Sequence, residues 1–439
     1  MTILFAVIDT AVICVVPCLC LLLPVPFGII AALTVMFTAF LFVNIVPDVL
    51  TNARIRLKVL NGAGTLLIAF LISAAVLTAI LVYRIATGIF TPETDIAYIV
   101  FAVLCDFIVL ANGLVRIYAT SVQAGIKLRV LTAVFAFIPV INAIFLIKLI
   151  ITAKREAAFE KDYDAREKVF AENKVCATRY PIMMVHGVFF RDSRLLNYWG
   201  RIPPALERCG AVIRYGGQQS ALSVEQSANE LAARIEQTCK ELGCEKLNVI
   251  AHSKGGLDTR YAISKLGCGK YIASLTTICT PHHGCIFVEN IYNRIPEAGR
   301  LKMAAAYNAA ARRAGDTAPD FLAAVGDLRE SVSIARDAEM PDDPDVYYQS
   351  VGAAAKDRHS GRFPLNISLP LVNKTDGEND GLVSVVSSMH GAKHTTMRVP
   401  GHRGITHADM IDLNRENVKD FDVRTFYIEL VNELRESGF

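Results

Sequence analysis

The stretch that decides the fold of the C-terminal half is "KLNVIAHSKGGLDTRYA", residues 246–262. Four apolar residues within 247–251 predict a buried strand, and a segment with helical spacing begins directly after it. Ser253 stands between the two, with the small residues Ala251 and Gly255 two positions before and after it. This arrangement is typical of a nucleophile elbow, in which a serine lies on a sharp strand-to-helix turn where the two backbones nearly touch.

The elbow pattern alone does not decide the function. With ordinary residue frequencies, a small-x-Ser-x-Gly match arises by chance roughly 0.3 times in a chain of this length. The alternative is an ordinary loop in which Ser253 caps the following helix. The rest of the chain therefore has to distinguish between the two interpretations.

Composition divides the chain into an apolar part and an ordinary globular part. The protein has 439 residues, of which 53% are hydrophobic, and its net charge is +3. This small charge gives no reason to expect nucleic acid as a partner. Residues 10–47 and 59–83 carry no charge at all, whereas the chain beyond residue 153 resembles a soluble domain. The sequence therefore predicts a membrane segment joined to a globular one.

Five apolar segments precede residue 153. A bilayer core requires about 20 apolar helical residues, and the sequence predicts spans at about 3–23, 27–46, 63–84, 96–116 and 130–152. The first span lacks a basic N-terminal region and further spans follow it, so we expect it to stay in the membrane rather than to be a cleaved signal peptide. Residues 1–153 are therefore predicted to form an all-α transmembrane region of about five spans.

Basic residues predict the orientation of these spans, since short cytoplasmic loops are rich in Lys and Arg. Two of the loops are basic, whereas the loop near 87–95 is acidic; the basic residues are Arg54, Arg56, Lys58, Arg116, Lys127 and Arg129. A full fifth crossing then places the globular domain on the extracytoplasmic face. Lys154, Arg155 and Lys161 oppose this orientation, and a re-entrant hairpin at Pro139 would leave the domain inside.

Residues 154–177 and 178–439 are predicted to be a helical linker and an α/β domain. Alternating charges indicate that the linker is solvated. In the domain, apolar strands alternate with helices, one of which runs from a capping box at Ser223 and Gln226 to Gly243. This alternation predicts a mostly parallel sheet with both faces covered, and active sites of such sheets lie at the carboxyl ends of the strands. Further strands are expected at 181–187, 211–217 and 274–280.

An elbow serine requires a base and an orienting carboxylate. After Ser253 the chain offers Asp380, in "GENDGLVSVVSS" (377–388), at a predicted strand-to-turn junction. It also offers two histidines, His402 and His407, in "HRGITHADMIDL" (402–413). We favour His407 as the base because it directly precedes an apolar helical run, where a loop histidine can lean over the edge of the sheet.

An oxyanion hole requires two backbone N–H groups near the nucleophile. One comes from the residue after the nucleophile, which is Lys254, and the other from the loop after the first core strand, where "HGVFF" places Val188. The sequence therefore contains every component of acyl-transfer chemistry.

Six stretches of the domain resemble bacterial triacylglycerol lipases of the α/β-hydrolase superfamily, in the family's order, over about residues 178–413. By this resemblance Ser253 is the nucleophile, Asp380 the acid and His407 the base, with Val188 and Lys254 forming the oxyanion hole. The resemblance does not extend to residues 1–153. The stretches are "YPIMMVHGVFFRD", "NYWGRIPPAL", "LNVIAHSKGGLDTRYAISKLG", "SLTTICTPHHG", "NDGLVSVVSS" and "THADMIDL".

The resemblance also implies a calcium ion near the base, and here the sequence departs from the family. Asp409, two residues after His407, fits one ligand position, but Leu413 replaces an expected polar ligand. Asp357 is a candidate for the second carboxylate, so the set of metal ligands is incomplete. The family's lone disulfide is not evident either, and the scattered cysteines suit a reducing or anaerobic setting.

A helical insertion at about 286–345 is expected to cover an apolar acyl pocket, either as a mobile lid or as a fixed cap. The resemblance implies an esterase of lipids that needs no organic cofactor. The predicted spans add a membrane anchor, which departs from the family, whose members are typically secreted. An acyltransferase with the same triad would instead pass the acyl group to an alcohol, and product analysis with added alcohol distinguishes it. A non-catalytic membrane scaffold with a relic hydrolase domain would fail to react with a fluorophosphonate probe at Ser253.

Overall fold

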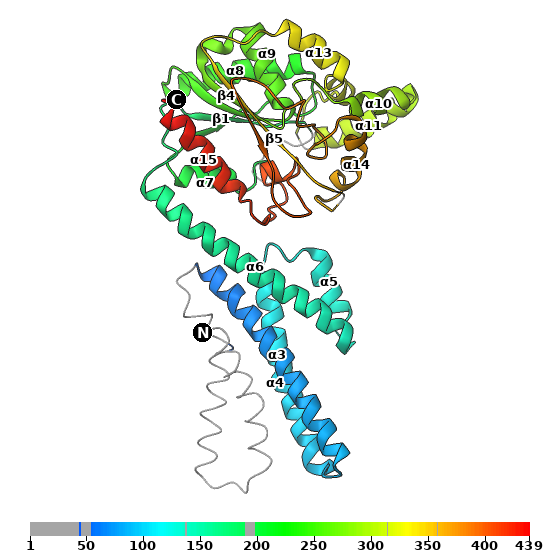
Figure 1. The fold of residues 1–439 in the computed structure, drawn as a ribbon. Helices are drawn as coiled ribbons and strands as arrows, with labels where there is room; N and C mark the ends of the chain where they lie inside the picture. The colour runs from blue at the N-terminus through cyan, green and yellow to red at the C-terminus, as the bar shows by residue number, and fades with distance from the viewer. Residues whose placement is uncertain (1–43, 45–53, 137, 189–197, 314, 358) are drawn as a thin grey trace. The chain divides into compact units, whose positions relative to one another are not determined.

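The computed structural model describes residues 44, 54–136, 138–188, 198–313, 315–357 and 359–439. The chain divides into two compact units, residues 1–165 and 166–439 (Figure 1). The division falls within a helix, α6 (Pro139–Glu172). Each unit has its own buried apolar cluster.

The described part of the N-terminal unit is helical. Helices α3 (Ile55–Ala86) and α4 (Pro92–Thr120) pack on each other through buried side chains such as Leu60, Leu67 and Ile117. Two segments, 55–86 and 95–120, are long and apolar enough to cross a membrane, and they contain the predicted spans 63–84 and 96–116. The predicted spans 3–23 and 27–46 lie outside the described residues, apart from residue 44.

The predicted fifth span is not one continuous helix. Helix α5 (Ile126–Val134) ends before Pro139, and α6 begins at this proline. Proline lacks the N–H of a helix interior and disfavours helical geometry in the residue before it, so it fits the first position of a helix instead. Residues 130–152 are therefore divided between two helices.

Helix α6 continues through most of the predicted linker, but its charges are not simply solvated. Glu156 is buried and accepts hydrogen bonds from Arg56 Nη1 at 2.9 Å and Ser121 Oγ at 2.6 Å. Glu167 is also buried and pairs with the Arg208 guanidinium. The expectation of a solvated linker is wrong at these positions, because sign alternation does not reveal which side chains meet an arginine elsewhere in the chain.

The C-terminal unit contains a six-stranded sheet, all parallel, in the order β2-β1-β3-β4-β5-β6. Five strands fall on apolar stretches of the sequence, whereas β6, with the sequence "KHTTM", has no apolar run and was not predicted. Because β6 lies at an edge, its side chains are less buried than those of the central strands. The strands are β1 (Ile182–Val185), β2 (Ile213–Tyr215), β3 (Leu247–His252), β4 (Ile272–Ile278), β5 (Tyr347–Ala353) and β6 (Lys393–Met397).

Helices cover both faces of this sheet. Figure 1 shows α8 (Val224–Leu242) and α9 (Lys254–Leu266) on one face, and α7 (Ile202–Arg208) and α15 (Val423–Glu436) on the other. The Ser223–Gln226 capping box starts α8, and Gly243 ends it in the left-handed conformation, as predicted. These observations confirm the parallel α/β architecture.

Further helices lie between β4 and β6. The predicted insertion between β4 and β5 is helical, and α14 (Leu365–Thr375) follows β5. There are also two short 3-10 helices in the described part of this unit. The first, η1 (Cys268–Tyr271), follows α9, and the second, η2 (Asp409–Ile411), precedes α15. The helices of the insertion are α10 (Ile286–Arg294), α11 (Glu297–Arg313), α12 (Phe321–Gly326) and α13 (Glu330–Glu339).

Candidate active site

Ser253 occupies a sharp turn between β3 and α9. Its φ is 54° and its ψ is −131°, a conformation that a residue with a side chain adopts at an energetic cost. The surrounding structure holds it there, because the Ser253 N–H donates to the Ile278 carbonyl at 2.9 Å. This strained backbone favours the elbow interpretation over an ordinary capping serine, and the side chain of Ser253 makes no capping hydrogen bond to α9.

The small residues beside Ser253 are required by close packing. A Cβ atom at Gly255 would collide with the carbonyl oxygens of Val185 and His186, so α9 can approach β1 only with glycine there. A Cβ at Gly187 would lie 2.8 Å from the Cβ of Ser253. The sequence pattern around the serine thus reflects the contact of three backbone segments.

His407 and Asp380 meet in the structure. His407 Nδ1 lies 2.7 Å from Asp380 Oδ2, and the His407 N–H donates to the Asp380 carbonyl at 2.9 Å. The second carboxylate oxygen of Asp380 accepts hydrogen bonds from the N–H groups of Leu382 and Val383. With both oxygens engaged, the Asp380 carboxylate is fixed in orientation and fixes one ring nitrogen of His407 in turn.

Asp380 does not stand at a strand-to-turn junction as predicted. It lies in the loop between α14 and β6, where the described pairing is one isolated bridge between Asn379 and Ser384. The alternation in "GLVSVVSS" suggested a strand, but the backbone N–H groups of Leu382 and Val383 turn toward the Asp380 carboxylate instead of a neighbouring strand.

The other candidate base, His402, is exposed and does not line the cavity described below. It lies in the loop after β6, residues 398–422, which also carries His407 and is called here the His407 loop. Of the two histidines, only His407 lines the same cavity as Ser253.

Both candidate oxyanion donors adjoin Ser253. Lys254 is the first residue of α9, and the first N–H groups of a helix have no intrahelical partners. Its side chain is buried and donates to Asp258 Oδ1 at 2.7 Å, which anchors this end of the helix. Val188 follows β1 and lines the cavity beside Ser253. The two N–H groups thus belong to a helix start and a strand end that meet at the elbow.

A tyrosine and a histidine connect these elements in a way the sequence did not predict. The Gly187 N–H donates to the Tyr198 hydroxyl at 3.0 Å, and this oxygen lies 2.6 Å from His252 Nδ1. Tyr198 therefore ties the loop that carries Val188 to the residue before the nucleophile. The sequence alone does not show this role, because the hydrogen bonds of Tyr198 join residues that are distant in sequence.

Ser253, His252 and His407 line a cavity of about 650 Å³. The rest of its wall is largely apolar and comes from three places: the insertion, the start of α14 and the His407 loop. Large concave pockets with few polar groups are typical binding sites. The insertion contributes Phe287, Ile291, Met303, Phe321 and Val325, among others, so it covers the site as expected.

The residues near Asp409 do not fit a calcium ion. Both Asp409 carboxylate oxygens accept hydrogen bonds from the Arg403 guanidinium, at 2.9 and 3.0 Å. Thr406 donates to the same carboxylate through its N–H and its hydroxyl. Arg403 also donates to Glu416 at 2.6 Å. Calcium requires six to eight oxygen ligands. Here both oxygens of the Asp409 carboxylate already accept hydrogen bonds from a guanidinium, so the residues present do not support the implied calcium site.

Relatives with curated functions are similar to part of the chain, while no family model matches it. A triacylglycerol lipase of Burkholderia plantarii is 27% identical over 277 residues, covering 50% of this chain and 77% of the lipase. One of Vibrio cholerae serotype O1 is 26% identical over 287 residues, covering 60% of this chain and 89% of the lipase.

Among solved structures, the mature form of a Bacillus licheniformis lipase is similar, with 19% identity and a TM-score of 0.43 over 58% of this chain and 92% of that one. The sequence relationship to these triacylglycerol lipases covers most of those enzymes' length. The chain is related to these lipases and is a carboxylic ester hydrolase.

Proposed function

We propose that Ser253, His407 and Asp380 form a catalytic triad that hydrolyses lipid esters. The observation that carries this proposal is the meeting of two groups at one cavity: a serine on a strained turn, and a histidine whose Nδ1 is fixed by a buried carboxylate. Fixing Nδ1 leaves Nε2 to accept a proton from the serine hydroxyl.

In the proposed mechanism, Ser253 Oγ attacks the ester carbonyl while His407 takes its proton. The Asp380 carboxylate stabilises the imidazolium that forms. The N–H groups of Val188 and Lys254 stabilise the oxyanion, and His407 then returns the proton to the leaving alcohol. Water, activated by the same histidine, attacks the acyl-enzyme and releases the fatty acid.

The cavity supports an apolar acyl chain as the substrate group. Its wall contains aliphatic and aromatic side chains from the insertion, such as Ile291 and Phe321, and from α14, such as Leu365. The relatives named above are triacylglycerol lipases, which agrees with a lipid ester. An alcohol could replace water as the acceptor, so the test below also measures transfer.

We expect kcat/KM for p-nitrophenyl esters to rise with acyl length until the cavity is filled. Each buried methylene contributes about 0.8 kcal/mol, so the increase is up to about fourfold per methylene. The measurement is initial-rate kinetics of the purified protein on esters of graded length, with product analysis in the presence and absence of added alcohol. A steady fall in kcat/KM beyond acetate would contradict a lipid substrate, and ester products in place of fatty acid would indicate an acyltransferase.

The proposal includes anchoring of the hydrolase in a membrane. Helices α3 and α4 are long and apolar enough to span one. Arg54, Arg56 and Lys58 lie before α3 and at its start, and Arg116 lies near the end of α4. Because short cytoplasmic loops are rich in Lys and Arg, we propose that these ends face the cytoplasm. A further crossing by residues 126–152 would place residues 178–439 outside.

Protease treatment of intact cells tests this topology. If the domain lies outside, fragments of residues 178–439 appear without permeabilisation, because surface loops are accessible to protease. A cytoplasmic protein in the same cells serves as the control for integrity. Survival of the domain in intact cells, with digestion after permeabilisation, would place it inside.

A further inference from the structure

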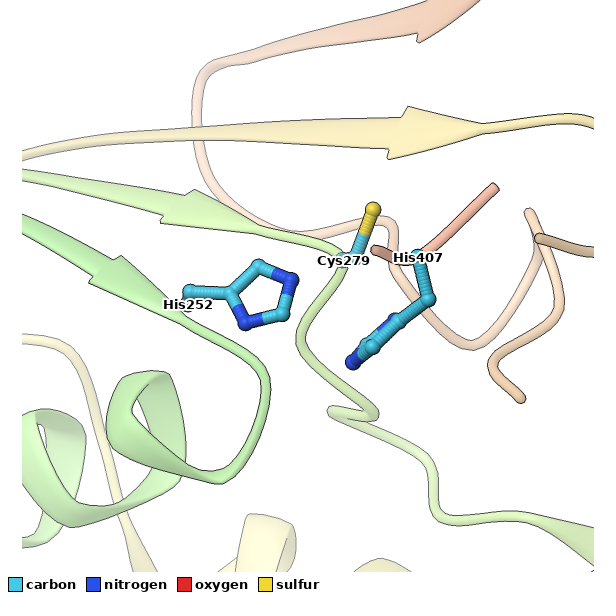
Figure 2. A group of neighbouring side chains, drawn as sticks. All are labelled: His252, Cys279 and His407. Carbon is cyan, nitrogen blue, oxygen red and sulfur yellow. The ribbon is translucent and has the colours of Figure 1, made fainter. Parts of the chain in front are cut away.

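Three potential metal ligands come together at the proposed active site, and one of them is His407. His252 ends β3, Cys279 follows β4, and His407 comes from the His407 loop (Figure 2). One potential ligand atom from each side chain lies within 4.8 Å of the other two. All three residues are buried. His252 and His407 line the cavity, so an ion that enters it can reach these two side chains, and Cys279 lies just beyond the lining.

His252 presents an unused nitrogen to this cluster. Its Nδ1 lies 2.6 Å from the Tyr198 hydroxyl, whereas its buried Nε2 has no hydrogen-bond partner in the described part of the chain. Burial lowers the pKa of His252 well below its usual value. A histidine that binds a metal through one nitrogen commonly has the other held by a polar neighbour, as Tyr198 does here.

Cys279 supplies a sulfur at a fixed place. Its backbone has a φ of 48°, and its N–H donates to the Val351 carbonyl at 2.7 Å, which holds the residue against the neighbouring strand. Burial and the nearby Asp380 carboxylate raise the pKa of the Cys279 thiol well above its usual value. Thiolate together with imidazole is a donor set that selects zinc and other soft divalent cations.

We propose that His252, Cys279 and His407 bind one soft divalent cation, such as Zn²⁺, and that this ion inhibits hydrolysis. The inhibition, though not the binding, rests on the proposed role of His407 as the base. On binding, the Cys279 thiol releases its proton to solvent and its sulfur bonds to the ion. His252 coordinates through Nε2, and water from the cavity takes a fourth position. Zinc binds nitrogen at about 2.0–2.1 Å and sulfur at about 2.3 Å. The three ligand atoms lie within 4.8 Å of one another, so small movements of the side chains bring them to these distances from one ion.

Coordination through either nitrogen of His407 would stop catalysis. Nδ1 is the atom that Asp380 fixes, and a bond from it to the ion breaks that hydrogen bond. Nε2 is the atom that must accept the serine proton, and a bond from it removes the base. The ion therefore competes with the catalytic geometry rather than with the acyl group.

Zinc titration of ester hydrolysis, with reversal by a chelator, tests the inhibition. Cys279→Ser is expected to need at least about tenfold more zinc, because a thiolate ligand is lost. Cys285→Ser is the matched control: Cys285 is a buried thiol that lines the same cavity but does not belong to the cluster. Inhibition of each variant is expressed relative to its own activity in chelator. Equal zinc sensitivity of Cys279→Ser and the unaltered chain, or loss of sensitivity in Cys285→Ser alone, would overturn the proposal.

Cadmium binding to the Ser253→Ala protein tests the site without any activity. We expect the ultraviolet charge-transfer absorption of a cadmium–thiolate bond, with about one equivalent fewer when Cys279→Ser is added. His252→Gln provides a second variant if circular dichroism shows that Cys279→Ser does not fold. A normal signal in an unaltered protein that lacks esterase activity would refute the proposed function alone, whereas an unchanged signal in whichever of these variants folds would refute the metal site.

Discussion

Ser253→Ala is expected to lower kcat for ester hydrolysis by about 10⁴–10⁶, the range typical for loss of a triad member. The variant cannot form the acyl-enzyme, because the attacking oxygen is absent. Alanine is as small as serine, and the hydrogen bond from the residue 253 N–H to Ile278 is kept, so the fold is expected to survive. Initial rates, circular dichroism and labelling by a fluorophosphonate probe measure the effect.

Ser264→Ala is the matched control for this variant. Ser264 lies on α9 like the residues after Ser253, is half-buried, and its hydroxyl has no hydrogen-bond partner among the described residues. Ser264→Ala is expected to leave kcat within about twofold of the value for the unaltered protein, because a substitution that removes no hydrogen bond changes stability little. Retention of more than a few per cent of activity in Ser253→Ala would move the nucleophile elsewhere. An unaltered protein that does not label at Ser253 would support the relic scaffold.

His407→Ala is expected to lower kcat by a similar factor of about 10⁴–10⁶, whereas His402→Ala leaves it essentially unchanged. His407 holds the hydrogen bond to Asp380 and lines the cavity, while His402 is exposed. The comparison uses kcat measured on the same ester, with the melting temperature as the check on folding.

The opposite result, an inactive His402→Ala and an active His407→Ala, would assign the base to His402. It would also require the His407 loop to rearrange when substrate binds, because His402 is outside the cavity in this structure. Asp380→Asn separates the two cases further, since it should impair the enzyme only if His407 is the base. If His402→Ala and His407→Ala were both inactive, the His407 loop as a whole, rather than one imidazole ring, would be needed for activity.

The sequence predicted the parts of the fold that depend on local apolar runs. The strand before Ser253 and the helix from Ser223 to Gly243 were found because burial and capping leave a clear local pattern. The edge strand β6 was missed because its residues are polar, and Asp380 was assigned to a strand end because the alternation after it resembles a strand.

Contacts between residues far apart in the sequence were harder to predict. Asp380 and His407 were candidates from the order of residues and from the resemblance, but their 2.7 Å contact joins loops that only the folded chain brings together. Nothing local shows that Glu156 is buried against Arg56 or that Cys279 lies beside His252. Such pairs are set by packing across the chain, and their side chains look like ordinary surface or core residues when read alone.

The Arg403–Asp409 pair has a consequence for where the protein can work. A calcium ion that fastens a loop is exchanged with the surroundings and leaves when its free concentration falls below the dissociation constant. The guanidinium of Arg403 belongs to the polypeptide and cannot be diluted or chelated away. The contact that this pair makes within the His407 loop therefore does not depend on calcium, and it can form on either side of a membrane across which calcium levels differ.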